Sequence, residues 1–296
     1  MTLKQNPKFP EGINASSDSH FSEFLLLLVA ITSTIVFLIV VLSFSIQYLA
    51  PLTPFRWEQA LTDLAPKKIL SETYAQELNS KDKDNLVNAQ IALQELGQAL
   101  TARMTLDDKI TFRFHLINSD TPNAFATLGG HIFITTELLN SITTENGLAM
   151  VVAHEMAHIK YRHPIQALGR GTLIQLGLAL FTGNQGSSVV QGLFGSAGLL
   201  TLLSFNRDME RESDTQAIEL LQRYYGHTQG ADEFFQSMNK QSDNEQWAAL
   251  FTTHPGTQER IEFINKNLSQ RTNAAVLTTP LDRRFLTLKQ DLLAEH

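Results

Sequence analysis

The longest apolar stretch of the chain lies near its N-terminus. Residues 24–50, FLLLLVAITSTIVFLIVVLSFSIQYLA, contain no charged residue, and Glu23 and Arg56 bracket this uncharged region. A helix needs about 20 apolar residues to cross a bilayer. A core helix so uniformly apolar would be unusual in a soluble domain, and the stretch is too long for a cleaved signal peptide. We therefore predict a transmembrane helix over residues 24–50.

This apolar stretch divides the chain into three parts. Residues 1–23 open with a polar segment that contains Pro, Gly, Asn and Ser, and we predict a flexible tail there. The transmembrane helix over 24–50 follows, and the prolines of PLTP (51–54) indicate a short stiff linker behind it. Because no internal repeat divides the remainder, residues 51–296 are predicted to form one domain.

Within this domain, apolar residues recur with helical spacing in some segments and alternate with polar residues in others. KITFRFHLI (109–117) alternates and predicts a strand, while NAFATLGGHIFIT (123–135) predicts two short strands around Gly129 and Gly130. Helices are predicted at 84–103, 143–163, 204–225 and 257–268. The mixture predicts an α+β fold that is mostly helical with a small sheet.

Two shorter apolar runs, GTLIQLGLALF and LLTLLSF, lie within residues 171–205, and a Gly- and Ser-rich segment (183–198) separates them. Each run is too short to span a bilayer. We predict a mobile helical hairpin near the site described next. Buried core fits the pattern equally well, and a surface that touches lipid is a third interpretation.

The segment VVAHEMAHIKYRHP (151–164) carries the first candidate chemistry, on a helix expected to begin at Thr143 and to end before Pro164. His154 and His158 are four residues apart and share one helix face, as two ligands of one metal ion require. Glu155 borders the same site, where it can take a proton from a water on the metal. By chance, H-E-x-x-H occurs in about one chain per hundred of this length, so a metal-free buried helix is the alternative.

Two histidines do not complete a zinc site, and the residues directly behind the motif do not supply a third ligand. The metzincin pattern requires Gly at position 161 and His at position 164, where this chain has Tyr161 and Pro164. His163 is one position away, beside a proline that disrupts the helix. We therefore predict that His163 is a partly exposed residue at the helix end, favourable for the helix dipole, and not a ligand.

A second helix offers the missing ligand. NRDMERESD (206–214) places Glu210 and Asp214 four residues apart on one face, while Glu212 points away from both. One carboxylate can bind the metal while the other accepts a hydrogen bond from a ligating histidine and fixes its ring. Taken alone, this stretch fits a solvated charged face. Downstream of an H-E-x-x-H helix, it predicts Glu210 as the third ligand and Asp214 as the carboxylate behind a histidine.

Three segments in combination, HEMAHIKYRH, NRDMERESD and THPGTQERI, resemble the M48 family of zinc peptidases over about residues 65–270. The family pattern is H-E-x-x-H-x-x-x-R-H, then S-R-x-x-E-x-x-A-D, then a downstream His-Pro. The chain departs from it at Asn206 and Ser213, where the family usually has Ser and Ala, and neither departure removes a ligand. The resemblance implies a zincin-like metallopeptidase domain with one Zn²⁺ per chain, in the branch that carries this domain on a single anchor.

The resemblance also implies an activity. The implied activity is that of a zinc endopeptidase in which Glu155 is the general base and the fourth zinc position is open for water. Its implied substrates are proteins or peptides, such as misfolded or envelope proteins. The family's His-Pro position makes His254 a candidate catalytic donor or inhibitory zinc ligand, and a plain surface histidine is the alternative. Near Gly129 and Gly130, an exposed edge strand is a candidate for pairing with an extended substrate, and an ordinary turn is the alternative there.

Composition and charge narrow the remaining choices. The net charge is −7 and no long basic run occurs, which argues against a nucleic-acid partner. The chain has no cysteine, which excludes disulfides and thiol ligands. The flanking charges barely distinguish the two membrane orientations. The resemblance to single-anchor bacterial peptidases implies a single-pass inner-membrane protein with a periplasmic catalytic domain. A membrane-anchored scaffold or chaperone with a structural zinc is the alternative function.

Overall fold

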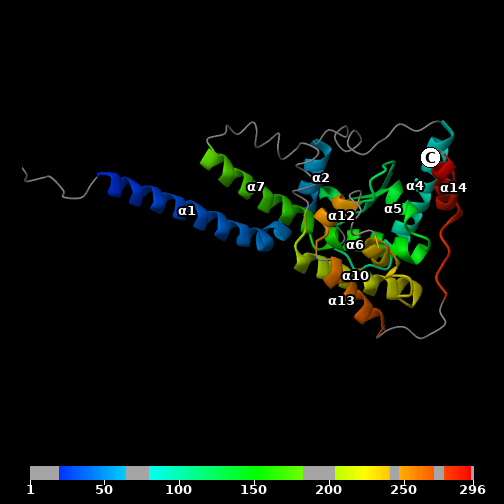
Figure 1. Ribbon diagram of the computed structural model, residues 1–296. Coiled ribbons are helices and arrows are strands. Elements are labelled where there is room, and N and C mark those ends of the chain that lie inside the picture. The colour runs from blue at the N-terminus through cyan, green and yellow to red at the C-terminus, as the bar shows by residue number, and fades with distance from the viewer. Residues whose placement is uncertain are drawn as a thin grey trace, which may run out of the picture.

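A long apolar helix projects from a mostly helical body that holds one small sheet (Figure 1). The computed structural model describes residues 20–64, 80–107, 109–182, 204–240, 247–255, 257–269 and 277–294. The projecting helix, α1 (His20–Leu49), begins before the predicted position 24, and its segment His20–Ile46 is long and apolar enough to cross a membrane. The α+β prediction is confirmed in its coarse form, a helical fold with a small sheet.

A short connection joins α1 to the body. The chain passes through a single 3-10 turn (Ala50–Leu52), in which Pro51 occupies the first helical turn, and enters α2 (Phe55–Leu64). Most of the predicted tail, 1–23, lies outside the described residues. The division into tail, membrane helix and catalytic domain stays a prediction.

The sheet has three strands in the order β1-β3-β2. Strand β1 (Arg113–Ile117) runs parallel to β3 (His131–Thr135), and β2 (Ala124–Ala126) pairs antiparallel with β3. The two short strands around the glycine pair are therefore confirmed. The strand predicted at 109–117 is shorter than expected, because only its second half pairs with β3.

Helices form the rest of the body, and among the described residues five of them were not predicted from the pattern: α2, α5, α11, α12 and α14. The helices described after α2 along the chain are α4 (Ser80–Thr101), α5 (Thr136–Asn140), α6 (Glu145–Lys160), α7 (His163–Thr182), α10 (Arg207–Tyr225), α11 (Glu233–Lys240), α12 (Ala248–Thr253), α13 (Thr257–Ser269) and α14 (Arg283–Ala294).

The metal-motif helix, α6, begins and ends differently from the prediction. Its N-cap is Thr144, one residue after the predicted cap, and the Thr144 side chain accepts a hydrogen bond from the Gly147 N–H. The helix ends at Lys160 with Tyr161 as its C-cap, and Arg162 follows with a left-handed φ of 62°. Pro164 was expected to end this helix but lies in the first turn of α7. A proline is tolerated there because a first-turn N–H has no partner within the helix.

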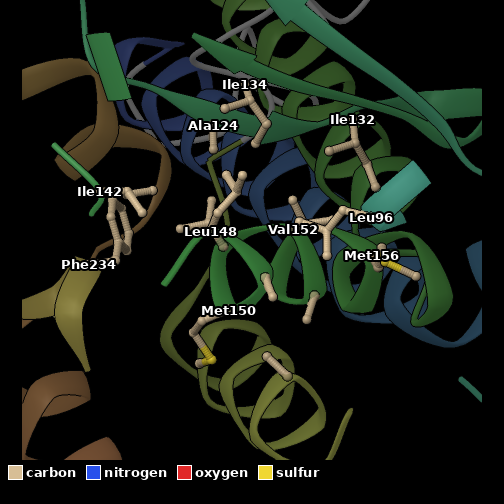
Figure 2. Packing of buried hydrophobic residues seen from close by; sticks show 14 of the residues in the cluster. Leu96, Ala124, Ile132, Ile134, Ile142, Leu148, Met150, Val152, Met156 and Phe234 are labelled. Atoms are coloured by element: carbon tan, nitrogen blue, oxygen red, sulfur yellow. The ribbon is translucent and has the colours of Figure 1, made fainter. Parts of the chain in front are cut away.

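The core forms where α6 packs under the sheet. Figure 2 shows Ile132 and Ile134 of β3 on the side of the sheet that faces Leu148 and Val152 of α6. All four are fully buried. On its other side, α6 packs against α10. A helix that is apolar almost all round is buried on both sides, and this burial fixes the position of the polar residues that α6 carries.

The apolar residues 171–205 are described only in part. The first run continues α7 without a break to Thr182, and α7 packs against α1. Residues 183–203 lie outside the described residues, so the predicted hairpin as a whole is not tested.

Candidate metal centre

The two central helices bring the predicted ligands together. His154 and His158 lie on one face of α6, and Glu210 lies in the first turn of α10, which Asn206 caps by accepting a hydrogen bond from the Met209 N–H. Asn caps a helix as well as Ser does, so the departure from the family pattern at Asn206 preserves the local structure.

The ligand atoms converge on one point. The Nε2 atoms of His154 and His158 are 2.9 Å apart, and the Glu210 carboxylate lies 3.3 Å from the former and 3.5 Å from the latter. His254, the C-cap of α12, brings its Nδ1 to 3.1 Å from Glu210 and 3.4 Å from His154 Nε2. The candidate ligand atoms of these four residues all lie within 4.8 Å of one another.

The hydrogen bonds behind the cluster show that the residues fit a metal ion. Asp214 Oδ1 lies 2.9 Å from His154 Nδ1, so this nitrogen is the donor and the Nε2 lone pair points into the cluster. The Nδ1 atom of His158 contacts His163 at 2.9 Å, which leaves its Nε2 for the same centre. Two imidazole lone pairs that face each other at this distance need a cation between them, and zinc prefers this set of imidazole and carboxylate ligands.

The pKa shifts of His154 and His158 show which of the two rings must lose a proton before it can bind a metal ion. Burial and Arg260 lower the pKa of His154, but Asp214 and Glu210 together raise it to about 9. Burial lowers the pKa of His158 well below its usual value, so this ring stays neutral and able to bind a metal. A zinc ion must therefore displace a proton from His154, and zinc binding weakens as the pH falls.

Glu155 lies at the edge of the cluster. Its side chain is 2% exposed, Oε1 is 3.5 Å from His254 Nε2, and Oε2 has no hydrogen-bond partner. Burial raises the pKa of this carboxyl above its usual value. An orphaned carboxylate oxygen in a buried site is costly to the fold. Glu155 therefore has the position and the proton affinity of a general base, and that role stays a proposal.

Arg260 of α13 is a buried cation that sequence reasoning missed. Its Nε and Nη2 bind Asp214 at 2.8 and 2.7 Å, and its Nη1 lies 2.7 Å from Glu210. Burial raises the pKa of the Glu210 carboxyl, but Arg260 and His254 more than offset this and hold it well below its usual range. The arginine therefore keeps both carboxylates ionised behind the histidines. A signal was available, because Arg260 falls on the face of α13 that also carries the buried Ile261 and Ile264.

The burial of His163 shows that its predicted exposure was wrong. It was predicted to be partly exposed at the end of a helix, but it is 1% exposed and begins α7, where its Nδ1 meets His158. Its Nε2 lies 3.2 Å from the Glu212 carboxylate, so Glu212 supports the site from its rim without joining the cluster. His163 is therefore not a solvated helix end but a buried partner of the candidate ligand His158. Ser213, the other departure from the family pattern, is fully buried beside this pair.

The glycine pair lies away from the ligands. Gly129 and Gly130 are buried in a 3-10 turn (Leu128–Gly130) covered by α2, and the Gly129 N–H donates to Glu58 at 3.3 Å. Their role in substrate binding stays a prediction. The strand atom that reaches the cluster is the carbonyl oxygen of Ala124 in β2, which lies 3.3 Å from His254 Nε2.

Substituting Gly130 with Ala should destabilise the fold more than the same change at Gly226. Both glycines have left-handed φ, 86° and 77°, which costs an alanine about 1–2 kcal/mol. A Cβ on Gly130 would also lie 1.9 Å from the Thr111 carbonyl oxygen, whereas nothing lies within 4 Å at Gly226. We expect about 1–3 kcal/mol of additional loss at Gly130. Thermal unfolding of both variants measures this difference, and equal losses would show that the turn has room for a side chain.

Replacing Asp214 with Asn should weaken zinc binding by roughly 10–100-fold. The amide cannot replace the charge that holds the His154 Nδ1–H and pairs with Arg260. Asp208→Asn is the matched control, because this aspartate lies on the same helix with its side chain 92% exposed. Competition with a chromogenic chelator measures both affinities. Similar losses in the two variants would mean that Asp214 does not act on the ligand.

An H-E-x-x-H helix that is completed by a glutamate from a second helix defines a metallopeptidase-type zinc centre. Residues 88–268, more than half of the chain, match the model of Peptidase family M48, and the chain belongs to this family. Its members are zinc metallopeptidases, so the predicted cofactor, one zinc ion, is confirmed by family and by the four-residue cluster that can hold it.

Individual relatives are similar at moderate identity. The Beta-barrel assembly-enhancing protease of Escherichia coli (strain K12) is 29% identical over 189 residues, which is 60% of this chain and 38% of the relative. The Mitochondrial metalloendopeptidase OMA1 of Saccharomyces cerevisiae is 30% identical over 170 residues, 55% of this chain and 48% of the relative. The chain thus spans less than half the length of these relatives. It covers more of Metalloprotease LoiP of Escherichia coli (strain K12), with 26% identity over 69% of this chain and 81% of the relative.

Proposed function

We propose that this chain is a membrane-anchored zinc endopeptidase with a zincin-like catalytic domain. The observation that carries the proposal is the position of Glu155, a fully buried carboxylate with one unpartnered oxygen, beside three convergent ligands, His154, His158 and Glu210. The anchor is α1, whose segment His20–Ile46 is apolar and exposed. The names of the relatives, all of them proteases, support the activity.

The chain's own residues divide the work of peptide hydrolysis. His154, His158 and Glu210 would hold a zinc ion, which would supply Lewis acidity for the peptide carbonyl and the attacking water near neutral pH. Glu155 takes a proton from the attacking water and returns it to the leaving amine. Asp214 and His163 hold the rings of His154 and His158 in the orientation that binding needs.

His254 decides whether the site is open. With this ring among the ligands, the cluster has four protein ligands, which is typical of structural zinc sites, whereas catalytic sites keep one position open. This geometry favours the alternative function, a scaffold or chaperone with structural zinc. We propose instead that His254 closes a catalytic site at rest, since Glu155 would have no use in a purely structural one. An extended substrate then pairs with the edge of β2 at Ala124 once His254 has moved.

We propose that the substrates are proteins at the bacterial inner membrane and that the catalytic domain lies in the periplasm. The membrane helix and the bacterial relatives named above support the location. Misfolded envelope proteins are the substrate class that we propose.

Two measurements on the full chain in detergent micelles test the activity. Metal analysis should find about one zinc ion per chain, as the one cluster among the described residues implies, and the protein should hydrolyse unfolded casein until a chelator removes the metal. Bound zinc without hydrolysis in any variant would favour the structural role.

The His254→Ala variant should hydrolyse casein faster than the unaltered protein and keep its zinc. The alanine opens the fourth position while His154, His158 and Glu210 remain as ligands. A variant of another histidine, His227→Ala, is the matched control, because His227 follows the end of α10 in the chain and is not part of the cluster. A slower His254→Ala enzyme with intact zinc would instead assign His254 the catalytic donor role that the family pattern suggests.

A further inference from the structure

Helix α7 follows the membrane helix over most of its own length. Figure 1 shows α7 leaving the body beside α1, and the two helices are in contact. Five of the six partly buried residues described in α1 recur at helical spacing and form one stripe, Thr32, Ile35, Ile39, Ser43 and Ile46, while the sixth, Ser45, lies beside it. The stripe meets α7 at its membrane-boundary end, because a Cβ on Gly169 would lie 2.9 Å from Ile46.

The two helices have stretches of similar length on the same side of their contact at Gly169 and Ile46. From Ile46 back to Thr32 is 14 residues, about 21 Å of helix, and from Gly169 to the end of α7 at Thr182 is 13 residues, about 20 Å. Because Ile46 ends the segment that can span a membrane, the shared region lies entirely at the depth of that span. It covers roughly two thirds of a hydrocarbon core about 30 Å thick.

The sequence of α7 fits this depth. No charged residue occurs between Arg170 and Arg207, and the Arg170 guanidinium is directed to Met209 of α10, toward the body. The Thr172 hydroxyl donates to the Leu168 carbonyl oxygen, so it needs no water. Gly169, where a Cβ would meet Ile46, is a small residue of the kind that allows two helices to approach closely in lipid.

We propose that α7 enters the bilayer beside α1, from Gly169 to Thr182, and that the hydrocarbon of the membrane is the partner of its apolar surface. An uncharged helical stretch of about 20 Å beside a membrane helix is not typical of a soluble domain. The occupant is lipid and not a second copy of the chain, because the neighbouring α1 is itself long and apolar enough to cross a membrane and is not buried inside the protein.

This placement fixes the height of the metal centre. His163, which contacts the ligand His158, is six residues before Gly169, or about 9 Å along α7. The His158 ring lies a further 5.0 Å from the His163 ring, so the metal centre lies within roughly 15 Å of the membrane surface. The inference goes beyond the proposed peptidase function, since the depth of α7 does not depend on catalysis.

Single cysteines test this depth, because the full chain has none of its own. Leu173→Cys and Leu180→Cys place a nitrobenzoxadiazole fluorophore on α7. Leu38→Cys on α1 is the reference inside the span, and Leu286→Cys on α14, 40% exposed, is the reference outside it. Each labelled chain must keep the thermal unfolding of the unaltered protein. The proteins are then reconstituted in phosphatidylcholine vesicles with and without brominated acyl chains.

We expect brominated chains to quench most of the emission at positions 38, 173 and 180 and little of it at 286. Position 180, deeper by about 10 Å than 173, should respond most strongly to bromines near the end of the acyl chain. An unquenched, red-shifted label at 180 would place α7 in water, and an unquenched, blue-shifted label would place it against protein. Either result overturns the proposal, and so does an unquenched label at 38, because α1 would then not span.

Discussion

Substituting Glu155 with Gln should leave zinc bound and reduce casein hydrolysis by about 100- to 10,000-fold, the usual contribution of a general base. Glutamine has nearly the same shape, so the packing of α6 is kept, but the amide cannot accept a proton. Its neighbours, His154 and His158, retain their partners Asp214 and His163. Zinc content and turnover measured on one sample separate loss of the base from loss of the metal.

Glu219→Gln on α10 is the matched control for this experiment. The Glu219 side chain is 44% exposed and pairs only at 4.0 Å with Arg223, so the change should leave turnover unaltered. If Glu155→Gln retained substantial turnover with zinc in place, Glu155 would not be the base. If Glu155→Gln lost zinc as well, the Glu155 carboxylate would be needed to hold the metal, and the loss of turnover would not support its role as general base.

The part of the site that lies within one helix could be predicted from the sequence. The four-residue spacing places His154 and His158 on one face whatever the rest of the chain does. The same rule gave Glu210 and Asp214 as a pair on a second helix. Spacing alone does not separate their roles, because it does not say which of two carboxylates lies nearer to a partner helix. In the structure, Glu210 meets both histidines and Asp214 meets one of them from behind.

The residues that the pattern missed depend on tertiary packing. His163 looked like a helix end because Pro164 follows it, but the left-handed Arg162 allows a second helix to start there. That conformation is held by Glu58 of α2, whose carboxylate accepts the Arg162 Nε–H at 2.7 Å. The two residues are far apart in the chain, and no local signal connects them. Burial of His163 follows from this junction and not from its neighbours in sequence.

Contacts between residues far apart in the chain also explain why some helices were not predicted from the sequence. Three of the helices absent from the predicted pattern, α5, α11 and α12, have eight residues or fewer, too short for apolar periodicity to be distinctive. Helix α12 is nevertheless the element that delivers His254 to the cluster. Because packing sets the position of this short helix, the sequence pattern alone could not place His254 beside His154, His158 and Glu210.

Replacing Arg260 with Met should destabilise the metal-free protein by about 3–5 kcal/mol, the typical cost of leaving a buried charge without its partner. Two carboxylates, Glu210 and Asp214, would lose the cation that binds both. This should lower the thermal midpoint by roughly 6–20 °C. Added zinc should restore part of the loss, because it binds the folded state and neutralises Glu210.

Two further variants make this result specific to the buried network. Arg260→Lys keeps the charge but not the two parallel bonds to Asp214 at 2.7 and 2.8 Å, so its midpoint should fall between those of Met and the unaltered protein. Arg207→Met removes an arginine whose side chain is 73% exposed and which pairs with Glu259, and the loss should not exceed about 1 kcal/mol. Thermal unfolding in detergent micelles, with and without zinc, gives all the midpoints. Equal losses for Arg260→Met and Arg207→Met would show that Glu210 and Asp214 do not need Arg260, and that the charge of the metal site is balanced in another way.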